Sequence, residues 1–121
     1  MGDLSPYEIE QRLRSLYNQL AQVRENLNRR ADDYQSAAAE FKTNYAKAFL
    51  EARMNTKTIK EAEMKAQQFT ASEEARYKAT EQLVLNERKA VDALIAQVDI
   101  ARSLYAKATR EEEYYRKGAG D

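Results

Sequence analysis

Residues 9–52 read IEQRLRSLYNQLAQVRENLNRRADDYQSAAAEFKTNYAKAFLEA. Every third or fourth position in this stretch is apolar or alanine, without a break. Such spacing places these positions on one face of a single long helix. The positions are Ile9, Leu13, Leu16, Leu20, Val23, Leu27, Ala31, Tyr34, Ala38, Phe41, Tyr45, Ala48 and Ala52.

A second stripe of the same spacing runs from Tyr77 to Ala108, and only Thr80 and Glu87 interrupt its apolar character. Two amphipathic helices therefore account for most of the chain. Because such helices bury their stripes only against other helices, the sequence predicts an all-α fold. The simplest form is a long antiparallel helical hairpin or coiled coil, which association with further copies would turn into a helical bundle.

Capping signals give the predicted helix boundaries. Ser5 is expected to cap the first helix, with Pro6 at its first position and Glu8 completing a capping box. Polar and β-branched residues interrupt the pattern at 53–58, and Thr58 with Glu61 forms a second capping box. We therefore predict one domain, residues 1–121, with helix one over about 6–54 and helix two over about 58–116.

The second helix has two irregular regions. Ser72, followed by Glu73 and Glu74, has the composition of a fresh helix start, so residues 69–72 are compatible with a kink, a loop or continuous helix. Residues 117–121 contain two glycines and no apolar anchor. We expect this tail to fray.

Composition excludes several functional classes. Twenty basic and twenty acidic residues balance, so no net field attracts the chain to nucleic acid or to an anionic membrane. The chain lacks cysteine and histidine, hence a thiol nucleophile and the usual zinc ligands, and no metal or cofactor is expected. The N-terminus lacks a signal-peptide core, and no apolar run approaches the roughly 20 residues that span a bilayer. We expect a cytoplasmic protein without membrane contact.

The second helix carries more apolar side chains than packing against one neighbouring helix requires. A helix that is apolar over so wide an arc usually contacts two neighbours. Homo-oligomerisation is the favoured explanation, and a groove for a different protein is the alternative. The predicted association surface consists of Leu83, Val84, Val91, Leu94, Ile95, Val98 and Leu104.

Basic residues and tyrosines raise the alternative of nucleic-acid binding. The candidate contacts are Arg12, Arg24, Arg29, Arg30 and Lys42. Acidic residues stand in the same turns as several of them, which favours an ordinary salt-bridged helix surface. Eight tyrosines could stack on single-stranded bases. Four of them lie on the two apolar stripes, where core packing is favoured: Tyr34, Tyr45, Tyr77 and Tyr105.

Nothing in the sequence has the pattern of a catalytic site. It contains no Gly-rich phosphate loop, no nucleophile elbow and no paired carboxylates in apolar surroundings. A convex helical surface would also leave a substrate open to water. We therefore predict that the protein is not an enzyme.

Three segments carry a resemblance to known proteins: YAKAFLEAR at 45–53, TIKEAE at 58–63 and ARYKA at 75–79, followed by the helix over 83–105. Together they resemble a loose class of small phage and prophage helical-hairpin proteins, often encoded beside recombination and replication genes. The resemblance covers about residues 5–115. It implies an accessory of phage DNA metabolism that binds another protein or single-stranded DNA, and it transfers no functional residues.

The sequence thus predicts a non-enzymatic helical-hairpin protein that self-associates and binds another protein. Its expected role is that of an accessory or scaffold in phage or bacterial DNA recombination or replication. Two alternatives stay open: direct binding of single-stranded nucleic acid, and inhibition of a host protein.

Overall fold

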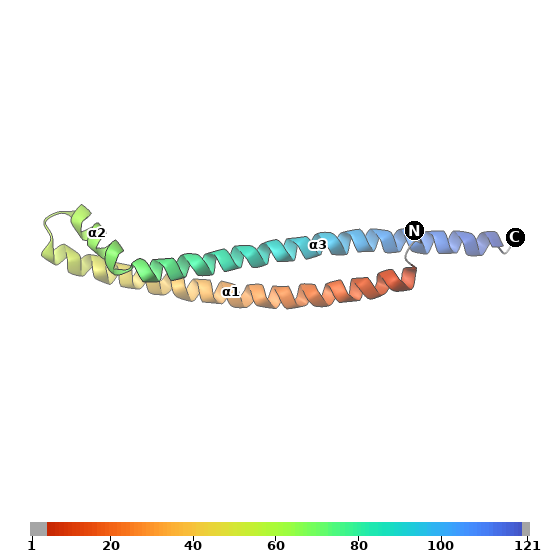
Figure 1. The fold of residues 1–121 in the computed structure, drawn as a ribbon, viewed down its shortest axis with the longest axis horizontal. Helices are drawn as coiled ribbons and strands as arrows, with labels where there is room; N and C mark the ends of the chain where they lie inside the picture. The colour runs from red at the N-terminus through yellow and green to blue at the C-terminus, as the bar shows by residue number, and fades with distance from the viewer. Residues whose placement is uncertain (1–4, 120–121) are drawn as a thin grey trace. The chain divides into compact units, whose positions relative to one another are not determined.

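A computed structural model describes residues 5–119 of the chain (Figure 1). This part consists of three helices, α1 (Pro6–Asn55), α2 (Ile59–Phe69) and α3 (Ala71–Ala119), and contains no strand. The predicted all-α fold of mutually packed helices is confirmed. The segment predicted as one helix over 58–116 is divided into α2 and α3, and α3 continues through residues 117–119, which were expected to fray. Residues 120–121 of the predicted tail lie outside the described residues.

The capping signals position both predicted helix starts. The Ser5 amide donates to Glu8 Oε2 and the Glu8 amide donates to Ser5 Oγ, each over 3.2 Å, which is a complete capping box. At the start of α2 the Glu61 amide donates to Thr58 Oγ1 over 3.1 Å. At the end of α1, Thr56 Oγ1 donates to the Ala52 carbonyl over 2.8 Å. These side chains bind backbone groups that a helix end leaves without intrahelical partners.

The junction between α2 and α3 is a single residue, Thr70. It is fully buried, and its amide and its hydroxyl both donate to the Ala66 carbonyl, over 3.0 and 2.8 Å. The Glu74 amide in turn donates to the Thr70 carbonyl over 2.9 Å. The boundary before α3 therefore lies at Thr70, two residues before Ser72, which the sequence suggested as a helix start. Ser72 is an exposed residue inside α3.

The chain divides into two compact units, and each contains a part of α1 and a part of α3. Unit 1 comprises Met1–Glu25 and Arg88–Asp121, and unit 2 comprises Asn26–Glu87, including α2. The core of unit 1 is aliphatic. Its buried members are Leu16, Leu20, Leu94, Val98 and Ala101, and Leu13, Val23 and Val91 pack against them.

The packing of unit 2 includes many small and aromatic side chains beside the buried Val84. Ala62 and Ala66, one turn apart on α2, are both fully buried, and α2 lies beside the C-terminal turns of α1 (Figure 1). Between α1 and α3, Tyr77 stacks on two rings of α1, Tyr34 and Phe41, with centroid distances of 5.7 and 5.6 Å.

Polar pairs also join α1 to α3 within unit 2. Tyr34 donates to Glu81, Glu40 pairs with Arg76 and Asn44 donates to Glu73, over 3.3, 3.6 and 2.7 Å. Residue numbers fall along α3 as they rise along α1. This is the order of contacts between helices that run in opposite directions.

Candidate interaction surfaces

Four residues of the predicted association surface are engaged inside the chain. Val84, Leu94 and Val98 are buried, with exposed fractions of 6, 9 and 5%. Val91 is half-buried against the unit 1 core. The regular apolar stripe of the second helix is therefore covered by the chain's own packing, and these four positions are not open to a partner.

The other three predicted residues are exposed. Leu83, Ile95 and Leu104 have exposed fractions of 38, 36 and 47%. Ile100, which is not among the seven predicted residues, is the most exposed large aliphatic residue of α3 at 62%. The residues of α3 available to a partner are thus the off-stripe ones, because the stripe itself belongs to the core.

Two of these exposed residues, Ile100 and Leu104, line an apolar groove in unit 1. It is formed by both helices, with Ile9 and Arg12 from α1 and Gln97, Ile100, Ala101 and Leu104 from α3. Ile100 and Leu104 also line a second, shallower hollow on α3 alone, together with Asp99, Ser103 and Lys107. Ile100 and Leu104 line both hollows, so this pair forms an apolar surface that the two hollows share.

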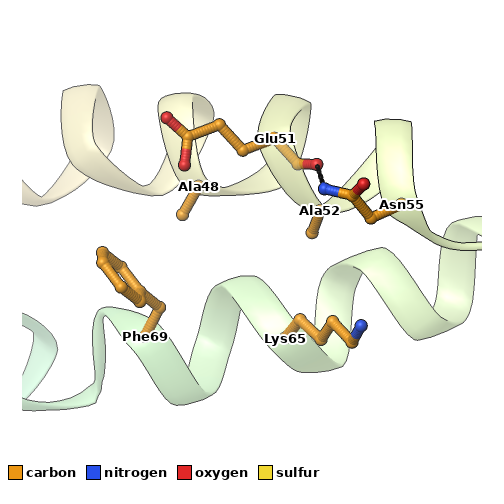
Figure 2. A pocket seen from close by; sticks show the side chains of 6 residues that line it. All are labelled: Ala48, Glu51, Ala52, Asn55, Lys65 and Phe69. Carbon is orange, nitrogen blue, oxygen red and sulfur yellow. Dashed lines mark hydrogen bonds between the residues drawn. The ribbon is translucent and has the colours of Figure 1, made fainter.

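Unit 2 has a groove between α1 and α2 (Figure 2). Ala48 and Ala52 point from α1 toward α2, and Phe69 projects from the end of α2 toward α1. Phe69 nevertheless stays 78% exposed. The buried positions Ala62 and Ala66 are continued by Thr70, which stands four residues after Ala66, and not by Phe69.

The five candidate nucleic-acid contacts are all exposed. Arg12 and Arg24 belong to unit 1, whereas Arg29, Arg30 and Lys42 belong to unit 2. Arg29 and Arg30 line a polar hollow together with Asp32 and Asp33. The two carboxylates offset the positive charge at this point, as the intermixed charges of the sequence suggested.

The four tyrosines on the apolar stripes are partly buried and partly open to solvent. Tyr34, Tyr45, Tyr77 and Tyr105 are half-buried. The pKa of the Tyr34 phenol is raised, first by its hydrogen bond with Tyr77 and then by desolvation and by the Glu81 carboxylate. The stacked rings of Tyr34, Tyr77 and Phe41 are packed on one another, so they contribute to the contact between α1 and α3 and do not form a free stacking platform.

The remaining features concern metal sites, buried polar groups and membrane-spanning segments. Among residues 5–119 no group of carboxylates is placed to hold a metal ion. One buried hydroxyl, Oγ1 of Thr109, has no hydrogen-bond partner within the described part of the chain. None of the described helices contains a stretch long and apolar enough to cross a membrane.

Comparison of the chain with protein-family models, curated proteins and solved structures gives no match. The resemblance to phage helical-hairpin proteins therefore stays a prediction from the sequence. Arguments about function rest on the surfaces described above.

Proposed function

We propose that this protein is a non-enzymatic helical scaffold that self-associates and binds another protein through the apolar side chains exposed on α3. The observation that carries this proposal is the Ile100–Leu104 pair of unit 1. Both side chains remain exposed beside Leu94, Val98 and Ala101, which the same helix buries in the core.

Exposed aliphatic residues scattered singly are normal on a protein surface, whereas a contiguous apolar surface marks an interaction site. Ile100 and Leu104 are one turn apart and share two hollows, so they form a continuous surface. Burial of such a pair in an interface would remove apolar area from water, which is the main favourable contribution to protein association. The proposed setting, DNA recombination or replication in a phage or bacterium, rests on the sequence resemblance alone.

The test is the mass in solution, measured by sedimentation over a range of protein concentrations. We expect the wild type to exceed the monomer mass of 14.0 kDa as concentration rises. Replacing Ile100 and Leu104 together by Gln should keep the protein at the monomer mass without loss of helical circular dichroism. The matched control replaces Tyr114 and Tyr115 together by Gln. These side chains are 75 and 72% exposed on the same helix, and their replacement should leave the association unchanged.

The outcomes separate the alternatives. A wild type that stays monomeric at the highest soluble concentration would contradict the self-association. The same measurement with a single-stranded oligonucleotide tests direct nucleic-acid binding, whose signature is an affinity that falls steeply with salt. Salt-sensitive binding that is lost when Arg12 and Arg24 are replaced by Ala would replace the scaffold proposal.

A further inference from the structure

One outward face of α3 in unit 1 has a specific arrangement of charge. Asp99, Ile100, Ser103, Leu104 and Lys107 line a single hollow, and all five are exposed. Their spacing of one, three and four residues places them on one side of the helix, with Asp99 one turn before Ser103 and Lys107 one turn after it. The face therefore carries an acid at one end, a small residue in the middle and a base at the other end.

Asp99 and Lys107 are too far apart to form an ion pair with each other. Eight residues of helix separate Asp99 from Lys107 by about 12 Å along the axis. Within residues 5–119 neither side chain takes part in an ion pair, whereas Glu112–Arg116 and Glu10–Arg14 on the same unit do. Asp99 and Lys107 are thus available for charges supplied from outside the chain.

A second copy of the same face supplies those charges in the required places. If two α3 helices cross in opposite directions about a two-fold axis at Ser103, Asp99 faces the partner's Lys107, and Lys107 faces the partner's Asp99. The small Ser103 meets the partner's Ser103 on the axis and allows the helices to approach closely. Ile100 and Leu104 lie beside the axis, where the contact removes both from water.

We propose that this protein forms a two-fold homodimer through the Asp99–Lys107 face of α3 in unit 1, with the two α3 helices antiparallel at Ser103. This inference rests on the self-association in the proposed function and specifies its geometry. A parallel arrangement would place Asp99 against the partner's Asp99 and is disfavoured by repulsion. The overall charge balance of twenty basic and twenty acidic residues leaves no net repulsion between copies.

The adjacent groove supports the same occupant. Ile9 and Ala101 form its floor, since both are buried, and Arg12 and Gln97 contribute to its lining. Ile100 and Leu104 line both this groove and the outward face. A second copy that covers this pair would therefore border the groove.

Charge reversal tests the pairing directly. Asp99→Lys places like charges at both symmetric contacts, and so does Lys107→Asp. Each single variant should raise the dimer dissociation constant by about tenfold, since two exposed pairs change from attraction to repulsion. An equal mixture of the two variants should restore a dimer close to wild-type affinity, because every contact then joins Lys to Asp. Sedimentation equilibrium gives the masses, and circular dichroism checks the helical content.

Arg102→Asp is the matched control. It changes the net charge by the same amount as Lys107→Asp, at an exposed residue next to the proposed axis but outside the hollow. Its dissociation constant should stay near that of the wild type. Equal weakening by Arg102→Asp and by Lys107→Asp, or failure of the mixture to restore the dimer, would overturn the proposed pairing.

A covalent probe tests the axis itself. The chain has no cysteine, so Ser103→Cys introduces a unique thiol. A disulfide requires the two Cα atoms to lie about 4.4–6.8 Å apart, which the two-fold axis provides at this position. Under mild oxidation Ser103→Cys should form a covalent dimer readily, and Arg102→Cys much less so.

The failures of the two proposals differ. A wild type that oligomerises while ignoring charge reversal and giving no Ser103→Cys cross-link would overturn this dimer geometry and leave the self-association intact. A wild type that is monomeric at every concentration would overturn both.

Discussion

The two units hold α1 against α3 with different side chains. In unit 1 the contact consists of branched aliphatic residues such as Leu16, Leu20, Leu94 and Val98. In unit 2 buried apolar residues such as Val84 are joined by stacked rings around Tyr77 and by polar pairs such as Asn44–Glu73. Aliphatic packing depends mainly on buried area, whereas stacked rings and hydrogen bonds depend on geometry. The contact between α1 and α3 thus depends mainly on buried apolar area in unit 1, whereas unit 2 adds ring and hydrogen-bond contacts whose strength depends on geometry.

The largest expected effect is in the aliphatic core of unit 1. Leu94→Ala removes a side chain that is 9% exposed and should lower the free energy of unfolding by about 2–5 kcal/mol, because it loses buried area and leaves a cavity. Urea denaturation followed by circular dichroism measures the change. Leu85→Ala, at an exposed leucine of the same helix, is the control and should cost less than about 0.5 kcal/mol. Equal costs at both positions would contradict the assigned core.

The second effect tests the close packing of α2 in unit 2. Ala66→Leu inserts a large side chain at a position with no exposed surface and should cost about 1–3 kcal/mol through overpacking. The control is Ala75→Leu, at an exposed alanine of α3, with an expected change within about 0.5 kcal/mol. If Ala66→Leu were tolerated as well as Ala75→Leu, α2 would not be closely packed at Ala66.

The third effect concerns the stacked rings of unit 2. Tyr77→Leu keeps an apolar side chain but removes the contacts with Tyr34 and Phe41, and should cost about 1 kcal/mol. Tyr115→Leu provides the comparison, because Tyr115 is 72% exposed and contacts only its neighbour Tyr114 among the rings of the described residues. A cost no greater than that of Tyr115→Leu would mean that the stack adds nothing to stability.

The smallest effect is a pH dependence. Because the pKa of Tyr34 is raised in the folded state above its ordinary value of 10.0, folding favours the protonated phenol. This contribution is fully present below pH 10.0 and is lost as the pH rises through the higher pKa of the folded state. Stability should therefore fall more between pH 9 and pH 11 in the wild type than in Tyr34→Phe, as urea midpoints at each pH would record. An identical decline in both proteins would remove Tyr34 as its source.

Helix content and helix starts could be predicted from the sequence because their signals are local. The apolar stripe from Ile9 to Ala52 and the capping residues Ser5 and Thr58 act within a few residues of their own positions. The partner surface depends on which stripe faces which helix. Val84, Leu94 and Val98 looked like an association surface because the sequence cannot show that the chain itself already buries them.

The division between α2 and α3 was harder to predict for a related reason. Thr70 continues the spacing of Ala62 and Ala66, and two backbone hydrogen bonds link it to the turns on either side. Apart from this spacing, nothing in the sequence indicates that a β-branched polar residue such as Thr70 is fully buried. Ser72 has the stronger local cap composition, but its surroundings in three dimensions place it on the exposed face of α3.

The one-residue junction at Thr70 has a consequence for how the length of this chain can vary. Each residue inserted there would rotate α2 by about 100° relative to α3 and would turn Ala62 and Ala66 away from their buried positions. The connection at 56–58 is different, because Lys57 lies exposed between two helix ends. Natural or engineered insertions should therefore be accommodated next to Lys57 and be excluded at Thr70.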